Sequence, residues 1–511
     1  MDCHVSTLKH QRTSVGSMNR LDHISKLPNE ILVLILDKLP MEAAVHTSLV
    51  SKRWKNLWKY KSSIDLGYSW IHKTHKSVLP SLFEVLQAHQ APRIQSISVA
   101  LRHDPSMFFE VGLLMAYAGW KHVEEIYLDM NDREDNRKRW TRRHPFVFIP
   151  QHEIGPCSSL RKLSMKFLQL ETLPPLRFMA LRELLLEHVM LFHDSVERIT
   201  TNCPSLDLLS LWNCNPTTDL MIIVAAGSSL VHLIIKEELT EVRSKTELFI
   251  RAANVKTVEF GLALPRKEYH LEGTLQCSEL TFRLNQMHHS RQALRVTSSG
   301  LRGNFSKNFL GILNDFRAGK VLTLSSWCIQ VLSMEVVKFG PPQHFEVTHL
   351  TLETGLKRWE FPGISYMLLA CYELESLVIV MGDHARLKFE YMEGYRHRGA
   401  ADVVYPRALQ DLTVVVFKNF GGAYQTWEDG SFDVDHFFAG YKYVGLLLWN
   451  LRTYAKNLRK IVFITKRKRY ETDQFHSFGK LSYHRRLYPQ FYRVPDLFIY
   501  KFDWDPGAGA P

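Results

Sequence analysis

The sequence has little that would direct the chain to a membrane, to an oxidising compartment or to a metal. Its seven cysteines are widely scattered among 511 residues and form no CxxC pair, so the sequence predicts neither a disulfide framework nor a zinc site. The apolar runs 31–36 and 220–226 are far shorter than the ~20 residues of a membrane-spanning helix. Residues 1–20 have polar residues throughout and lack the apolar stretch of a signal peptide. We therefore expect an intracellular protein, cytoplasmic or nuclear or both.

The sequence also lacks the motifs of common catalytic sites. It contains no GxGxxG, P-loop, HExxH or GxSxG pattern. Two histidine pairs, His72 with His75 and His288 with His289, have no cysteine or carboxylate companion at a spacing that suits a metal. We expect no catalytic residue, no bound metal and no cofactor.

Charge of one sign is in moderate excess. The chain has 64 Lys and Arg against 52 Asp and Glu, a formal net charge of +12. Because these basic residues are spread along the chain and mixed with acidic ones, a solvated basic surface explains them better than a nucleic-acid site does. The basic stretches 137–143 and 466–469 leave nucleic-acid binding and nuclear import open as alternatives.

The segment 27–58 predicts three short helices. Pro28 suits a helix start, Pro40 ends that first helix near residue 39, a second covers 41–50, and Ser51 is a plausible N-cap for a third that reaches Trp58. Six consecutive apolar residues, 31–36, surround the first helix and leave it no polar face. Because so small a segment cannot bury two apolar faces in its own core, we infer that a partner protein covers one of them.

Beyond this segment a pattern of apolar-x-x-apolar-x-apolar recurs along the chain. Between Leu160 and Val255 its first positions advance by 21, 25, 24 and 25 residues, within the ~20–29 expected of leucine-rich repeats. Its first residues are Ile94, Val123, Leu160, Leu181, Leu206, Leu230, Val255, Val347, Leu374, Leu409 and Leu458. Each unit supplies one short strand that has no core until neighbours stack on it, so the pattern predicts a curved solenoid.

The alternation along these strands also predicts which side chains point away from the core. In the most regular repeats the outward apolar residues are Leu185, Leu208, Trp212 and Ile234, and charged residues surround them. Such a patch is typical of a protein-binding surface, although an adjacent loop could instead cover it. Cys157, Cys203 and Cys371 each stand three residues before a repeat leucine, and we interpret their thiols as packing groups.

The N-terminal segment closely resembles the plant-type F-box in its residues and spacing. The matching residues are Leu27-Pro28, Glu30-Ile31-Leu32, Ile35-Leu36, Leu39-Pro40, Ala44-Val45, Thr47-Ser48-Leu49-Val50 and Ser51-Lys52-Arg53-Trp54. Lys38 departs from the apolar residue often found there. The resemblance implies contact with a Skp-type adaptor, and through it a cullin scaffold, by Leu27, Pro28, Ile31, Leu32, Ile35, Leu39, Pro40, Val50 and Trp54.

The remainder resembles the leucine-rich regions of plant F-box proteins, and 407–466 resembles the FBD region that often ends them. The expected fold class is therefore an α+β or α/β solenoid, in which a three-helix F-box precedes irregular leucine-rich repeats. We expect a disordered tail at 1–20, the F-box at 21–62, repeats at 63–404, FBD-like repeats at 405–470 and a C-terminal tail at 471–511.

The resemblance implies a non-catalytic substrate-recognition adaptor of an SCF-type (Skp-cullin-F-box) ubiquitin ligase, whose repeats capture an unknown target protein. Two alternatives stay open. The chain could be an F-box scaffold that delivers no ubiquitin, or a basic repeat protein that binds protein or nucleic acid.

Overall fold

The structure is a computed structural model that describes most of the chain between residues 24 and 503. The described residues are 24–67, 82–100, 108–130, 157–167, 169–170, 178–238, 243–271, 277–284, 299–339, 344–357, 359–382, 409–419, 447–448, 450–451, 454–466, 488–494 and 497–503. The predicted tail at 1–20, both histidine pairs and the basic stretch 137–143 lie outside them.

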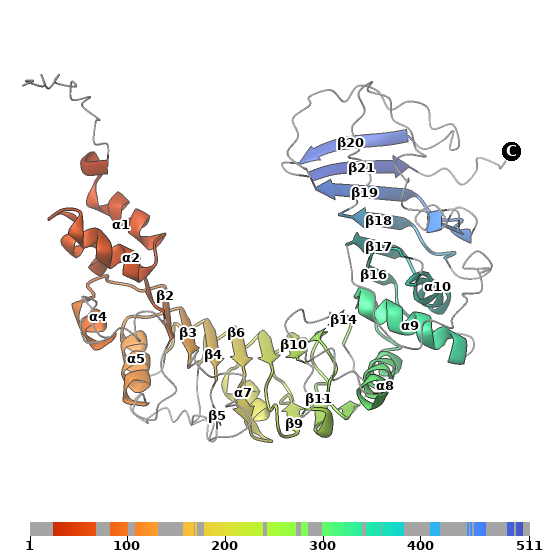
Figure 1. The fold of residues 1–511 in the computed structure, drawn as a ribbon, viewed down its shortest axis with the longest axis horizontal. Coiled ribbons are helices and arrows are strands. Elements are labelled where there is room, and N and C mark those ends of the chain that lie inside the picture. The colour runs from red at the N-terminus through yellow and green to blue at the C-terminus, as the bar shows by residue number, and fades with distance from the viewer. Residues whose placement is uncertain are drawn as a thin grey trace, which may run out of the picture.

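The described chain is an open horseshoe whose inner side is lined by one sixteen-stranded sheet (Figure 1). In spatial order its strands are β1 (Ser63–Leu66), β2 (Ser96–Ala100), β3 (Glu125–Asp129), β4 (Lys162–Lys166), β6 (Glu183–Glu187), β8 (Leu208–Trp212), β10 (His232–Glu237), β12 (Thr257–Leu262), β14 (Glu279–Leu284), β15 (Val321–Leu324), β16 (His349–Thr354), β17 (Ser376–Met381), β18 (Val414–Lys418), β19 (Lys460–Lys466), β21 (Leu497–Asp503) and β20 (Tyr488–Val494). From β1 to β19 neighbouring strands are parallel, as in a solenoid built from repeats.

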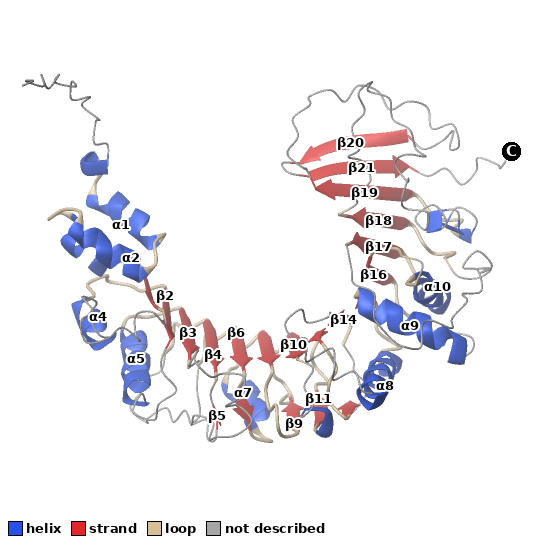
Figure 2. Cartoon of the chain, viewed as in Figure 1, coloured by secondary structure: helices blue, strands red, loops and turns tan. Residues whose placement is uncertain are grey.

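Helices and short strands return the chain along the outer side of the horseshoe (Figure 2). The helices are α4 (Leu82–Ala88), α5 (Phe108–Trp120), α7 (Ser195–Asn202), α8 (Ser299–Asp315), α9 (Ser326–Phe339) and α10 (Phe361–Ala370). The outer strands are β5 (Gln169–Leu170) with β7 (Met190–Leu191), and β9 (Leu220–Ile223), β11 (Glu247–Arg251) and β13 (Glu268–Leu271) as a second small parallel sheet.

The core lies between the inner sheet and the outer layer. The first residue of every predicted repeat is at most 1% exposed, and in ten of the eleven units the strand begins two residues later, as the pattern requires. The unit predicted at Leu409 is out of register, because Val415 rather than Val414 pairs with the buried Leu377, so this repeat begins at the buried Leu412. Residues 263–346, which lack clean repeats, still provide β14 and β15 in register with their neighbours. The segment predicted to be a C-terminal tail contributes β20 and β21, which extend the sheet in antiparallel fashion.

The N-terminal segment forms two α-helices and three 3-10 helices. They are η1 (Ile24–Lys26), α1 (Asn29–Asp37), α2 (Met41–His46), η2 (Thr47–Leu49) and η3 (Trp54–Tyr60). Helix α1 ends at Asp37, earlier than predicted. The amides of Lys38 and Leu39 donate to the main-chain oxygens of Ile35 and Leu36, three residues back, which is the 3-10 pattern, and Pro40 follows. The third predicted helix is of the 3-10 type, and it begins at Trp54 rather than directly after Ser51.

Candidate protein-binding surfaces

The N-terminal helices leave an apolar surface exposed. We call it the F-box face. Its members and their exposed fractions are Ile24 54%, Ile31 40%, Leu34 59%, Ile35 39%, Leu49 81% and Val50 75%. So many large apolar side chains on so small a unit indicate a surface that another protein covers.

The predicted adaptor-binding residues divide into three groups in the structure. Ile31, Ile35 and Val50 belong to the F-box face, and Pro28 and Pro40 are also exposed. Leu27, Leu39 and Trp54 are half-buried and pack against the chain's own core. Leu32 is fully buried, so its side chain faces the core rather than a partner.

Three members of the F-box face were not among the predicted contacts. Leu34 lies inside the apolar run 31–36, where helical spacing alone does not decide which residues face outward. Ile24 is the first residue of η1 and Leu49 is the last residue of η2, two 3-10 helices that the sequence did not indicate. Basic side chains are in excess among the exposed residues of the same segment, at Lys26, Lys38, Lys52, Arg53 and Lys55, against the exposed acidic Glu30.

Arg53, in the predicted signature 51–54, holds the start of α1 in place. Its guanidinium donates to the main-chain oxygen of Leu27, and its Nε donates to the Asn29 Oδ1 at 3.0 Å. These bonds fix the segment that leads into the F-box face. Arg53 therefore positions residues of the face besides adding positive charge near it.

A buried polar junction joins the N-terminal helices to the first strand of the sheet. The fully buried Lys61 Nζ donates to the main-chain oxygens of Leu36 at 2.6 Å and Leu39 at 2.8 Å. These oxygens lie at and just beyond the end of α1, where the negative end of the helix dipole attracts a cation. Burial lowers the pKa of Lys61, against the attraction of Asp65 and Asp37.

Two carboxylates and a histidine complete this junction. The Asp65 carboxylate on β1 accepts a bond from the Met41 amide at the start of α2 at 2.5 Å, and Asp37 accepts one from the Ser62 amide at 2.8 Å. Nε2 of the buried His89 lies 2.9 Å from the Lys61 main-chain oxygen, so that nitrogen carries the proton. The helices are thus bonded directly to the repeat body.

The concave face of the sheet carries the predicted substrate-binding residues. The register places Leu185 and Ile234 on either side of Ser210, while Leu208 and Trp212 lie two residues before and after it on β8. The four apolar residues therefore surround one small serine, as the strand alternation predicted. Trp212 is 37% exposed and the other three are half-buried. We call this group the concave cluster.

Charged side chains beside the concave cluster pair across neighbouring strands. Lys162 lies 2.8 Å from Glu183, and Lys166 lies 2.6 Å from Glu187. On the other side, Lys236 lies 3.7 Å from Glu259, which also contacts Arg283 at 2.8 Å. Trp212 stands between Glu187 and Lys236 in the register, so ion pairs flank it on both sides.

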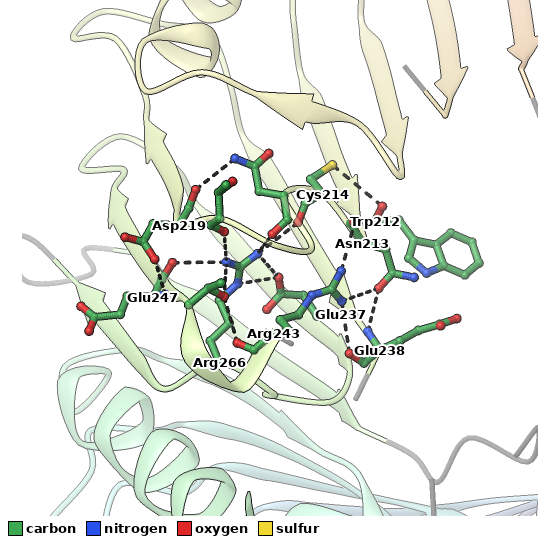
Figure 3. A network of polar contacts seen from close by, with 12 residues as sticks. Trp212, Asn213, Cys214, Asp219, Glu237, Glu238, Arg243, Glu247 and Arg266 are labelled. Atoms are coloured by element: carbon green, nitrogen blue, oxygen red, sulfur yellow. Dashed lines mark hydrogen bonds and ion pairs between the residues drawn. The ribbon is translucent and has the colours of Figure 1, made fainter. Parts of the chain in front are cut away.

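A buried network of polar residues begins directly after Trp212, at the ends of β8 and β10 (Figure 3). Arg266 binds the Glu237 carboxylate at 2.7 Å, and Tyr269 donates to the same carboxylate at 2.8 Å. Arg266 also donates to the main-chain oxygens of Cys214 and Asn215, which follow β8. The two positive guanidinium groups of Arg266 and Arg243 hold the pKa of Glu237 below its ordinary value although burial opposes this.

The same network fixes the small outer sheet behind the inner one. Arg266 reaches Thr218, Thr246 and Glu247, next to β9 and β11. The Glu247 carboxylate, at the start of the central strand β11, binds Lys267, and the Glu268 carboxylate, at the start of the edge strand β13, binds Lys307. The network thus connects the small outer sheet to the segment that directly follows Trp212 on β8.

The six cysteines within the described residues are all buried. Burial raises the pKa of the Cys157 and Cys203 thiols to about 11 and that of Cys371 to about 12. Because a neutral thiol is a poor nucleophile, these values agree with packing groups. Among the described residues no helix is both long and apolar enough to cross a membrane.

Comparison with known proteins gives matches in two segments. Residues 24–65 match the F-box domain family, and residues 117–255 match the family described as FBD-associated F-box protein At5g56370, LRR repeats. The first covers the N-terminal helices with the F-box face, and the second covers β3 to β10 with the concave cluster.

Individual relatives come from Arabidopsis thaliana. The putative F-box/FBD/LRR-repeat protein At3g49030 is 29% identical over 201 residues, which are 39% of this chain and 43% of that protein. The F-box/LRR-repeat protein At3g26922 is 28% identical over 196 residues, 38% of this chain and 60% of that protein. The putative F-box/LRR-repeat protein At5g54820 is 24% identical over 383 residues, 70% of this chain and 75% of that protein. The chain thus aligns with about half the length of the first two.

The fold and the two surfaces define a protein that joins an F-box to leucine-rich repeats. The matches of both segments and the relatives' names show that the chain is similar to the F-box/FBD/LRR-repeat proteins of Arabidopsis. Neither matched family is an enzyme family.

Proposed function

We propose that the protein is the substrate-recognition adaptor of an SCF-type ubiquitin ligase. The F-box face would bind a Skp-type adaptor, and through it a cullin scaffold, while the repeats hold a target protein. The observation that carries the proposal is the F-box face itself, a set of exposed apolar side chains on a segment that matches the F-box domain. Its basic surroundings favour an acidic partner.

In this proposal the parts of the chain have separate tasks. Residues 21–62, with α1, α2 and η3 as a compact three-helix F-box, provide the docking unit, and 63–404 provide the repeats. Residues 405–470 would be FBD-like repeats that continue the solenoid. In support, β18 and β19 pair in parallel register, and Asn457 donates to the Gln410 main-chain oxygen at 2.7 Å.

The function of such an adaptor is positional. A target lysine held near a ubiquitin-charged enzyme on the same scaffold reacts at a raised effective concentration. The buried junction of Lys61, Asp65 and Asp37 supports this role, because it holds the F-box in one orientation relative to the concave cluster.

The first test replaces Val50 by aspartate. Val50 is 75% exposed, so the aspartate should leave the fold intact. Its charge would have to be buried against an apolar partner, and the variant should therefore no longer co-purify with a plant Skp-type adaptor. Trp120→Asp is the matched control, since Trp120 is 71% exposed at the end of α5, outside the F-box. Adaptor binding that survives Val50→Asp in a folded protein would refute the proposed docking face.

Ubiquitin delivery is tested separately, by an assay of ubiquitin transfer. A reconstituted ligase should attach ubiquitin to a bound protein with wild-type chain and not with Val50→Asp. If the wild type binds the Skp-type adaptor yet transfers no ubiquitin to any bound protein, the chain is an F-box scaffold instead.

A further inference from the structure

The concave face differs in charge from the chain as a whole. From β3 to β19 the outward strand positions whose side chains the structure describes carry six basic residues, Lys162, Lys166, Lys236, Arg283, Lys418 and Lys460. They carry seven acidic residues, Glu125, Asp129, Glu183, Glu187, Glu259, Glu279 and Glu353. This described part of the face is therefore nearly neutral, although the chain has a net charge of +12.

Around the concave cluster, basic and acidic side chains form ion pairs with one another. Lys166 and Glu187 pair on one side of Trp212, and Lys236 and Glu259 lie on the other. The methylenes of Lys236 lie over Gly261, where an added Cβ would meet the Lys236 Cγ at 2.8 Å. This side chain is thus held against the sheet rather than extended toward a partner.

We propose that the concave cluster binds an uncharged, apolar segment of a partner protein, with Trp212 as its anchor. This inference rests on the proposed adaptor function, because it takes the concave cluster to be the site of substrate recognition. A charged partner group would lose its water beside four apolar side chains and would have to compete with ion pairs already formed. An apolar segment gains from contact with Trp212 and meets neither cost.

Hydrogen bonds hold the main chain at Trp212 in place, which suits a residue that anchors a partner. The main-chain oxygen of Trp212 accepts a bond from the His188 amide at 2.7 Å, and the next residue, Asn213, accepts bonds from Arg243 and from the Glu238 amide at 2.7 Å each. Both residues belong to the segment tied to the buried network (Figure 3). A main chain held in this way loses little conformational freedom when a partner binds the Trp212 side chain.

The test uses the full-length chain and a phage-displayed library of random twelve-residue peptides. Selection on the wild type should enrich uncharged peptides with aromatic or aliphatic residues. A synthetic peptide of the enriched sequence should then bind Trp212→Ala at least about tenfold more weakly by fluorescence anisotropy, the loss typical of an interface anchor. Val378→Ala is the matched control, because Val378 is a half-buried outward residue of the same face on the distant strand β17.

A second variant tests the role of charge pairing. Glu187→Gln removes the carboxylate that holds Lys166 beside Trp212, so selection on this variant should enrich peptides that add an acidic residue. Thermal unfolding of each variant shows whether it is folded like the wild type.

Several outcomes would overturn the proposal. The first is that selection on the wild type enriches acidic or basic peptides. The second is that the enriched peptide binds the wild type no more tightly than Trp212→Ala. The third is that selection on Glu187→Gln enriches the same peptides as selection on the wild type. Val50→Asp separates this proposal from the adaptor function, since that variant should lose the Skp-type adaptor and keep the peptide.

Discussion

At the scale of single residues, the junction between the F-box and the repeats is built from groups that are rarely buried. Lys61 is fully buried, and its ammonium serves as a cap for the carbonyls at the end of α1. His89 binds the main-chain oxygen of the same residue. A buried charge of this kind is tolerated only when its bonds are made, so the junction fixes one orientation of the F-box.

His89 makes the stability of the junction sensitive to acid. Burial is the largest cause that lowers its pKa to about 4, and the nearby Lys121 and Lys61 add to it. In the unfolded chain the ordinary pKa is about 6.5, so between these values the unfolded state binds more protons. The stability that the neutral ring contributes is present above pH 6.5 and is lost as the pH falls toward 4.

We expect His89→Gln to reduce this acid sensitivity, because glutamine can donate to the same oxygen and does not titrate. Between pH 6.5 and 4 the wild type should lose more unfolding free energy than the variant, by on the order of 3 kcal/mol. Urea unfolding at several pH values measures the difference, and His46→Gln on the exposed side of α2 is the control. Parallel pH profiles of wild type and His89→Gln would contradict the assignment.

At the scale of elements, the outer helices of the C-terminal half pack unusually close together. Gly363 in α10 faces α9, and a Cβ added there would lie 2.1 Å from the Ile329 main-chain oxygen. The Gly363 amide donates to the Ser333 hydroxyl at 2.8 Å, and that hydroxyl bonds to the Ile329 oxygen at 2.9 Å. The contact has no room for a side chain.

Gly363→Ala should therefore force α9 and α10 apart and destabilise the repeats by about 1–3 kcal/mol. Gly311→Ala in α8 is the matched control, since nothing lies within 4 Å of an added Cβ there. Alanine favours the helix over glycine, so the control should be stabilised by roughly 0.5–1 kcal/mol. Chemical denaturation measures both, and an equal effect of the two substitutions would contradict the close packing of α9 and α10.

At the scale of the whole molecule, the charge distribution bears on the alternative of nucleic-acid binding. The nearly neutral concave face offers no excess of cations to phosphates, so any RNA contact should involve other surfaces. We expect Lys166→Gln combined with Lys236→Gln to leave the binding of mixed-sequence RNA at low salt unchanged. Filter binding over a range of salt concentrations checks this. A reduced salt dependence in the double variant would instead place RNA on the concave face.

The sequence by itself determined the repeat architecture and the F-box segment. The spacing of the repeats identified first positions that are all buried, because each unit must contribute apolar side chains to the shared core, although the unit predicted at Leu409 begins at Leu412. The same alternation identified the four outward residues of the concave cluster. These features are local or periodic, and the order of residues records them directly.

Only the tertiary structure decided which apolar residues of the F-box segment face outward and what holds that segment in place. Leu32 and Leu34 stand in one apolar run, yet packing against the chain's own core buries the first and leaves the second 59% exposed. The cap that Lys61 provides for α1 joins residues 22 and 25 positions apart. The pairing of charges around Trp212 likewise depends on strand register. Contacts between distant residues follow from the packed fold, and no short pattern in the sequence encodes them.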